Sequence, residues 1–167
     1  MRKIIVCDYN PEWDSIYQKE KSILIATIGD VIQKIHHIGS TSVKGLSSKP
    51  IIDILIETDN LNSLDSSNHL FEKIGYEVMG EFGISGRRFF RKGGDDRTHH
   101  IHAFKINDEN VIRHLAFRDY LRNNPDVAGE YSKIKLEAVS FCNNDIQKYC
   151  DYKDAFIKKY EKIAMDV

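Results

Sequence analysis

Near the start of the chain, apolar residues recur at steps of three and four, which predicts a helix with one buried face. An Asn-Pro pair precedes them. Asn10 suits the N-cap and Pro11 the first helical position, so the helix is expected to begin there and to end near Ile28. The residues of the apolar face are Trp13, Ile16, Tyr17, Leu24 and Ile28. Residues 3–8, before the helix, have the pattern of a short strand.

Further short apolar segments have the pattern of β-strands. The segment at 50–56 is almost wholly apolar, which is typical of a strand buried on both faces of a sheet. A Gly-Gly-Asp-Asp turn separates the last two segments, so these are expected to pair as a hairpin. The predicted strands are 31–38, 50–56, 76–81, 87–92 and 98–105, with a helix at 66–74.

From Asp108 onward the pattern is helical. One helix is predicted to run to about Asn123, a second to start at Asn124-Pro125, and a third to be capped by Asn144. Their predicted inward residues are Val127, Tyr131, Ile134, Ala138 and Phe141, then Tyr149, Phe156, Tyr160 and Ile163. We therefore expect one α/β (α+β) domain over residues 1–167, with a mixed-sheet core to about residue 106 and a helical flank from about 107 to 167.

Net charge and cysteine content argue against several classes of function. The 167 residues include 24 basic and 25 acidic side chains, a net charge of −1, which disfavours general nucleic-acid binding. The three cysteines form no C-x-x-C pair, so neither a disulfide framework nor a thiolate zinc site is indicated. No apolar run approaches the ~20 residues of a membrane span, so we expect a cytoplasmic protein without a membrane partner. The oligomeric state stays open.

The first candidate for chemistry is the run Gly39, Ser40, Thr41 and Ser42, directly after a predicted strand. Small residues in succession offer backbone N–H groups, and these three hydroxyls could join them in binding phosphate oxygens. Turns are built from the same residue types, so the run alone is weak evidence. Lys49, just before the apolar strand, is a further candidate for phosphate binding.

Asp53 interrupts the apolar strand, and a lone buried carboxylate is costly unless it is paired or bound to metal. It could form a salt bridge with Lys49 or with an arginine of the hairpin, or it could be functional. His100 and His102 alternate along their strand and so share one face, about 7 Å apart. Such a pair could chelate a metal or hold a phosphate, or could be a hydrogen-bonded pair on a half-exposed strand.

Basic residues flank the hairpin turn, and arginine binds phosphate or carboxylate bidentately. Neighbours on a strand face opposite sides, so only one or two of these residues are expected to reach a pocket. The set is Arg87, Arg88, Arg91, Lys92 and Arg97. Neither a P-loop nor a G-x-G-x-x-G motif occurs.

Several segments together resemble the GrpB-like family, and the similarity extends over nearly the whole chain. They are His37–Val43, Lys49–Ile56, Gly86–Lys92, Arg97–His102 and His114–Leu121, with the opening Asp8–Trp13. The resemblance implies a nucleotidyltransferase-like fold, and a similar domain is found fused to dephospho-CoA kinases.

The resemblance also implies roles for individual residues. Gly39 and Ser40 match the Gly-Ser that holds a triphosphate, and Asp53 matches one acid of an Asp-x-Asp pair that binds two magnesium ions. Ile51 or Leu55 stands where the second acid belongs, and the later strand offers only His100 and His102 in place of a third. One carboxylate with two imidazoles suits Zn²⁺, Mn²⁺ or Fe²⁺ better than Mg²⁺.

Three functions remain open. The first is an enzyme acting on a nucleotide or related phosphoester, with a divalent metal (Mg²⁺, Mn²⁺ or Zn²⁺) at Asp53, His100 and His102, and Arg87 or Arg88 balancing charge. The second is a non-catalytic module for a nucleotide or a coenzyme-A-like ligand. The third is a metal-dependent hydrolase that uses Asp53, His100 and His102.

The hydrolase interpretation makes a direct prediction. The purified protein is expected to contain Zn²⁺ at close to one ion per chain, and His100→Ala is expected to lose it because one of the ligands is removed. Elemental analysis of both proteins measures this. Metal-free wild-type protein would count against the interpretation.

Overall fold

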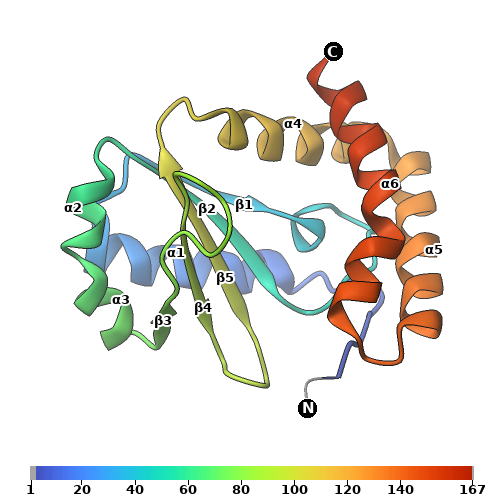
Figure 1. The fold of residues 1–167 in the computed structure, drawn as a ribbon, viewed down its shortest axis with the longest axis horizontal. Coiled ribbons are helices and arrows are strands. Elements are labelled where there is room, and N and C mark those ends of the chain that lie inside the picture. The colour runs from blue at the N-terminus through green and yellow to red at the C-terminus, as the bar shows by residue number, and fades with distance from the viewer. Residues whose placement is uncertain (1–2, 167) are drawn as a thin grey trace.

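The computed structural model describes residues 3–166 and contains a five-stranded mixed sheet in the order β1-β2-β5-β4-β3 (Figure 1). β2 and β5 run parallel, and the other neighbouring strands run antiparallel. The strands are β1 (Lys34–Ile38), β2 (Ile52–Thr58), β3 (Tyr76–Val78), β4 (Arg88–Lys92) and β5 (His99–Lys105). The mixed sheet and the predicted β4–β5 hairpin are confirmed.

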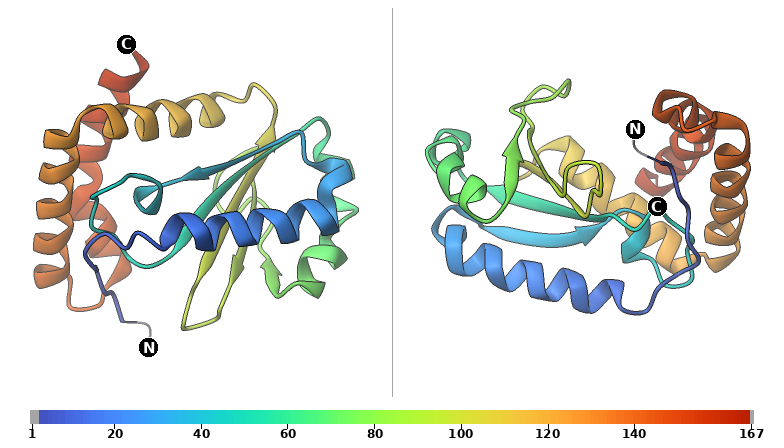
Figure 2. Two further views of the ribbon diagram at one scale, coloured as in Figure 1. Left: turned by 180° about the vertical axis from the view of Figure 1, so that it is seen from behind. Right: turned by 90° about the horizontal axis from the view of Figure 1, so that it is seen from below.

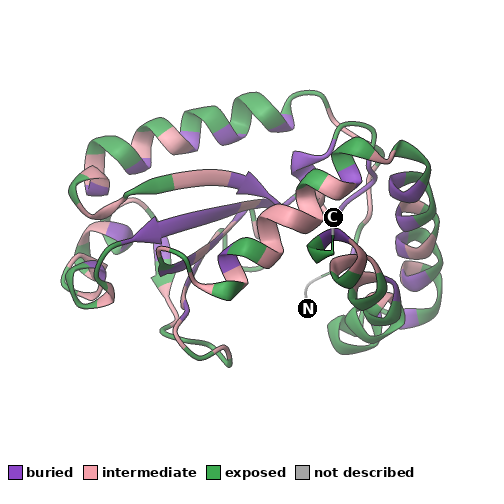
Figure 3. Ribbon diagram, turned by 90° about the horizontal axis from the view of Figure 1, so that it is seen from above, coloured by how far each residue is buried: buried purple, intermediate pink, exposed green. Residues whose placement is uncertain are grey.

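One face of the sheet is covered by the helices that precede and follow β1 and β2. Figure 2 shows α1 (Trp13–Ile28) lying along this face, and α2 (Leu61–Asp65) and α3 (Asn68–Lys73) pack against the same core. The core forms because apolar residues of alternate strand positions meet the apolar stripes of the helices. Its fully buried members include Leu24, Ile54, Phe71 and Ile101. In Figure 3 the central strands are almost wholly buried.

The C-terminal helices cover part of the other face and one end of the sheet. They are α4 (Glu109–Asn123), α5 (Pro125–Cys142) and α6 (Ile146–Met165). Val111 of α4 packs against Leu55 and Phe104 of the sheet. Helices α5 and α6 lie side by side at the end of the sheet where β1 stops (Figure 1). Within residues 3–166, no helix combines the length and apolarity needed to cross a membrane.

The loop between β1 and β2 is held by those helices. It begins with a short 3-10 turn, Ser40–Ser42, and continues to Ile51. Val43 and Leu46 are buried in a cluster with Tyr131 of α5 and Phe156 of α6. The loop is therefore fixed between sheet and helices, which sets the position of the polar residues on either side of Val43 and Leu46.

The strand predicted at residues 3–8 is wrong. Only an isolated bridge between Cys7 and Ser48 forms there. The Ile4 amide donates to the Asn144 side chain, and Ile4 packs with Tyr149. Ile4 is therefore buried against the C-terminal helices, whereas Ile5 is exposed, and among the described residues no sheet neighbour continues the pairing.

Several helix details also differ from the prediction. α1 starts at Trp13 rather than Pro11, although Asn10 Oδ1 still accepts from the Glu12 amide at 2.9 Å. The helix predicted at 66–74 is present but shorter, as α3, and a further short helix, α2, precedes it. Asp145, not Asn144, caps α6, because Asn144 is bonded to Ile4. Ile16 and Phe141, predicted inward, are exposed, since each lies one position off the buried stripe of its helix.

Candidate functional site

Strand register brings Asp53 and the histidines together. Asp53 pairs with Ile38 on one side and with His100 on the other, and His102 follows two residues later on the same face of β5. Residues in register on neighbouring strands point to the same side of a sheet. Asp53, His100 and His102 therefore lie on the face that α1 does not cover, at the end of the sheet where the β1–β2 loop begins.

The Asp53 carboxylate is held by both imidazoles. Asp53 Oδ1 lies 3.2 Å from His102 Nε2 and 3.6 Å from His100 Nδ1. Burial raises the pKa of Asp53, but the hydrogen bonds with His100 and His102 outweigh it and bring the pKa well below its usual range. Burial lowers the pKa of His100. The carboxylate is therefore ionised and accepts from imidazole N–H groups.

A pocket of about 100 Å³ lies beside Asp53, between the sheet and the C-terminal helices. Asp53 is the one acid among the described residues that line it, whereas three lysines contribute amines. The lining residues are Ser40, Ser48, Lys49, Ile51, Asp53, His100, Lys135, Tyr149 and Lys153. We call this the lysine pocket. Its charge is positive, and it adjoins the predicted Gly-Ser turn.

Lys135 of α5 is the most deeply buried of the three lysines, with 2% of its surface exposed. Its amine contacts Ser40 Oγ and lies 3.2 Å from the Ser47 carbonyl oxygen. The amine also lies 4.3 Å from the centre of the Tyr131 ring. Burial lowers the pKa of Lys135 well below its ordinary value. Burial of a lysine favours the neutral amine.

The amines of Lys49 and Lys153 lie over the aromatic ring of Tyr149. These amines are 5.1 Å and 4.7 Å from the centre of the ring. Burial, followed by the neighbouring Lys49, lowers the pKa of Lys153 to about 8. The Tyr149 side chain is fully buried, and among residues 3–166 its hydroxyl has no hydrogen-bond partner. Burial raises the pKa of Tyr149, so the hydroxyl keeps its proton and is a potential donor.

The four residues predicted to bind phosphate together are divided by the structure. Ser40 lines the lysine pocket, but Thr41 and Ser42 line a separate hollow of about 260 Å³ that also contains His37 and Arg122. Thr41 Oγ1 is bonded to His37 Nε2 at 2.8 Å, and Ser42 Oγ donates to the Gly39 carbonyl. The turn winds as a 3-10 helix, so its successive side chains point in different directions.

Gly39 lets the turn approach Asp53. Its φ is +72°, and a Cβ built on Gly39 would lie 2.6 Å from Asp53 Oδ2. Such a distance is too short for any side chain. The Gly39 position therefore requires glycine both for its backbone conformation and for the space beside the carboxylate.

The two predicted arginines take opposite sides. Arg87 is buried, its Nη1 lies 3.4 Å from His102 Nδ1, and its other nitrogens donate to the carbonyls of Glu81 and Phe82. Arg88 faces away and binds Asp65 with two hydrogen bonds. The predicted role of Arg88 at the site is therefore not supported by its position, because adjacent strand residues alternate between faces.

Sequence reasoning missed Lys135 and Lys153. A signal was present, because both occupy buried helical stripes. Lys135 lies between Tyr131 and Ala138, and Lys153 between Tyr149 and Phe156, at spacings of four and three residues. A lysine on an apolar stripe is unusual and must either reach solvent or have a polar neighbour in the interior.

The metal prediction can be compared with this donor set. The second carboxylate of a two-magnesium site is missing, because the two positions where it could stand hold the buried apolar residues Ile51 and Leu55. Magnesium prefers an octahedron of oxygen ligands, so the set does not fit it. In the part of the chain that the structure describes, no three His, Cys, Asp or Glu side chains are grouped to hold a metal ion. Metal binding by Asp53, His100 and His102 remains a prediction.

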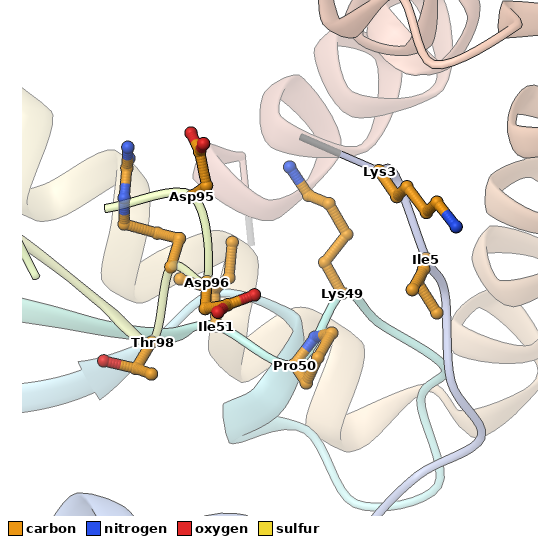
Figure 4. A pocket seen from close by; sticks show the side chains of 9 residues that line it. Lys3, Ile5, Lys49, Pro50, Ile51, Asp95, Asp96 and Thr98 are labelled. Carbon is orange, nitrogen blue, oxygen red and sulfur yellow. The ribbon is translucent and has the colours of Figure 1, made fainter. Parts of the chain in front are cut away.

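A second hollow adjoins the lysine pocket and shares Lys49 and Ile51 with it. Its volume is about 300 Å³. Figure 4 shows Lys49 between the N-terminal segment, with Lys3 and Ile5, and the β4–β5 turn, with Asp95 and Asp96. This hollow is larger than the lysine pocket and has both acidic and basic side chains at its edge.

Comparisons with known proteins give a consistent result. The family model described as "GrpB protein" matches residues 3–162. The glutamate-rich protein GrpB of Alkalihalophilus pseudofirmus is 32% identical, over 93% of this chain and 92% of its own length. The crystal structure of the conserved protein GrpB from Enterococcus faecalis has 45% identity and a TM-score of 0.93, and the match covers 97% of this chain and 98% of that one.

Other matches cover only part of the related protein. The UPF0157 protein YqkA of Bacillus subtilis is 40% identical over 98% of this chain, but the chain spans only 48% of YqkA. A dephospho-CoA kinase of Mycolicibacterium paratuberculosis is 21% identical over 94% of this chain and 45% of its own length. A structure of Cid1 with its short product ApU has a TM-score of 0.49 and 12% identity, too little similarity to bear on activity.

The close approach of Gly39 to Asp53 generates a prediction. Gly39→Ala and Gly45→Ala both place alanine at a positive φ, +72° and +84°, but a Cβ at Gly45 meets nothing within 4 Å. Gly45→Ala is expected to cost only the backbone strain of about 1–2 kcal/mol. Gly39→Ala is expected to cost at least about 1 kcal/mol more, because Asp53 must move and because the Gly39 backbone, at φ +72° and ψ −174°, lies in a region that other residues avoid. Urea unfolding followed by circular dichroism measures both, and equal losses would contradict the role given to Gly39.

Proposed function

The chain belongs to the GrpB family, and from its geometry we propose that it binds the phosphate groups of a nucleotide or related phosphoester in the lysine pocket. Ser40, Lys49 and Lys153 are the side chains proposed to contact the phosphate oxygens. Asp53 and His100 form the wall on the side of the sheet.

The observation that carries this proposal is the Tyr149 hydroxyl, which has no hydrogen-bond partner among residues 3–166 and belongs to a ring that two lysine amines approach. A buried polar group without a partner costs about 1–3 kcal/mol, so natural proteins rarely leave one unless something else binds there. Neighbouring ammonium groups repel one another and lose hydration on burial. An anion that accepts from Tyr149 and lies between Lys49 and Lys153 would relieve both penalties.

The size of the pocket limits the bound group. About 100 Å³ is roughly three times the ~30 Å³ share of one water molecule, which is enough for one phosphate group but not for a nucleobase. The remainder of a larger ligand is proposed to lie in the adjoining 300 Å³ hollow, reached past Lys49. There Asp95 and Asp96 offer acceptors for hydroxyl or amino groups, and Lys3 offers a donor.

Nucleotidyl transfer by two magnesium ions is not part of this proposal, because the pocket has one carboxylate and three amines. The ammonium groups of Lys49 and Lys153 are proposed to supply the positive charge that metal ions provide in such sites. The similarity to proteins named dephospho-CoA kinase adds coenzyme-A-like phosphoesters to the ligands worth testing. A non-catalytic binding module uses the same pocket and is distinguished by the absence of turnover.

The first test measures binding. Lys153→Met is expected to lower the affinity for pyrophosphate or ATP by about 10- to 100-fold, since a charge-assisted hydrogen bond contributes about 1.5–3 kcal/mol. Lys148→Met, an exposed lysine on the same helix, is the matched control and is expected to bind as the wild type does. Isothermal titration calorimetry gives the affinities. Equal affinities for the two variants would refute the site.

The second test uses pH. Because the pKa of Lys153 is lowered to about 8, its ammonium is present below that pH and is lost as pH rises through it. Sulfate keeps its charge from pH 6 to 10, so its affinity is expected to fall over this range through changes in the protein. The fall is expected to be several-fold.

Lys153→Arg serves as the control for this pH series. Arginine stays charged throughout, so the sulfate affinity of the Lys153→Arg variant is expected to change less between pH 7 and 9 than that of the wild type. Titration calorimetry at fixed ionic strength measures both series. Identical pH profiles for the wild type and Lys153→Arg would rule out Lys153 as the titrating group.

A further inference from the structure

Ser40 and Lys135 form a contact that phosphate binding alone does not require. Ser40 follows β1 and Lys135 lies on α5, yet the Lys135 amine contacts Ser40 Oγ. The amine also lies 3.2 Å from the Ser47 carbonyl oxygen, which fixes its direction. Within residues 3–166 Lys135 has no ion pair with a carboxylate.

A neutral amine placed in this way can accept a proton. With Ser47 O accepting one of its N–H groups, the lone pair of Lys135 is available to Ser40. Burial lowers the pKa of Lys135. The charges of Lys153 and Lys49 lower this pKa further, and the smaller effect of Asp53 raises it. The groups that face Lys135 are Tyr131 on α5, Tyr149 and Lys153 on α6, Lys49 in the loop, Asp53 on β2 and His100 on β5.

We propose that Ser40 is a nucleophile toward phosphorus and that Lys135 is its general base, giving phosphoryl transfer through a covalent serine intermediate. The inference rests on the proposed function, because it takes the bound phosphoester as its substrate. Serine activated by lysine is an established form of nucleophilic catalysis.

The step balances with the groups present. Ser40 Oγ forms a bond to phosphorus, the bond from phosphorus to the leaving oxygen breaks, and the leaving oxygen departs with that electron pair. The Ser40 proton moves to Lys135, which becomes an ammonium. In the second step water attacks phosphorus and loses a proton to solvent. The bond from phosphorus to Ser40 Oγ breaks, Oγ keeps that electron pair, and Lys135 returns its proton to Ser40 Oγ.

The rest of the pocket supports this chemistry. Lys49 and Lys153 line the same pocket as Ser40, with their amines over the Tyr149 ring, and oppose the negative charge that develops on the phosphoryl oxygens. Tyr149 adds a buried hydroxyl donor. Gly39 keeps the turn against Asp53 and so fixes the residue that follows it, Ser40.

The experiment treats the full chain with a small alkyl fluorophosphonate, whose phosphorus accepts a serine oxygen as fluoride leaves. Mass spectrometry of the intact protein and of its peptides measures the rate and position of labelling from pH 5 to 10. Wild-type protein is expected to be labelled at Ser40. The rate is expected to rise with pH and to level off well below the ordinary lysine pKa of about 10.4.

Three variants complete the test. Ser40→Ala is expected to abolish the label, and Lys135→Met to slow it at least about 100-fold, the usual size of a general-base contribution. Lys133→Met, an exposed lysine two residues away, is the matched control and is expected to react as the wild type does. Circular dichroism checks that each variant is folded.

Three results would overturn the inference. They are wild-type protein without label at Ser40, folded Lys135→Met labelled at the wild-type rate, and a wild-type rate that rises through pH 10 without a plateau. The wild-type pH profile decides the matter even when Lys135→Met does not fold. If the wild type binds pyrophosphate but is not labelled, Ser40 is not the nucleophile and the proposed function still stands. If the wild type does not bind pyrophosphate, both the proposed function and this inference are refuted.

Discussion

The grouping of three lysines beside one carboxylate, with Lys135 deeply buried, is the constraint that organises this end of the molecule. Charges of the same sign in a poorly hydrated space are unfavourable, so the pKa of Lys135 and Lys153 is lowered. The fold tolerates this arrangement by placing the Tyr131 and Tyr149 rings under the amines and the Ser47 carbonyl beside Lys135. Among residues 3–166, the Tyr149 hydroxyl in this pocket has no hydrogen-bond partner. These features supply the charge and the donor on which the proposed anion binding depends.

The β1–β2 loop connects the lysine pocket to the sheet. Val43 and Leu46 anchor it in the apolar cluster formed with α5 and α6. Ser40 and Lys49, on either side of that anchor, therefore meet helix residues that are far away in the sequence. The sheet contributes Asp53 and His100 through strand register, so the site combines one rigid sheet edge with one helical wall.

In this respect the lysine pocket differs from the two-magnesium site that the family resemblance implied. Magnesium sites depend on paired carboxylates, whereas here apolar Leu55 occupies the sheet and amines occupy the opposite wall. Positive charge is supplied by the protein itself. The proposed phosphate binding and the proposed serine chemistry both depend on this positive charge.

The amino-acid pattern by itself determined the order of the main elements, the mixed sheet, the β4–β5 hairpin and the placement of His100 and His102 on one strand face. These follow from residue period and local turn chemistry, which act over a few neighbouring positions. The tertiary structure alone decided that Thr41, Ser42 and Arg88 lie away from the pocket and that Lys135 and Lys153 line it. Those outcomes depend on how α5 and α6 dock against the loop, a long-range packing choice that no local spacing encodes.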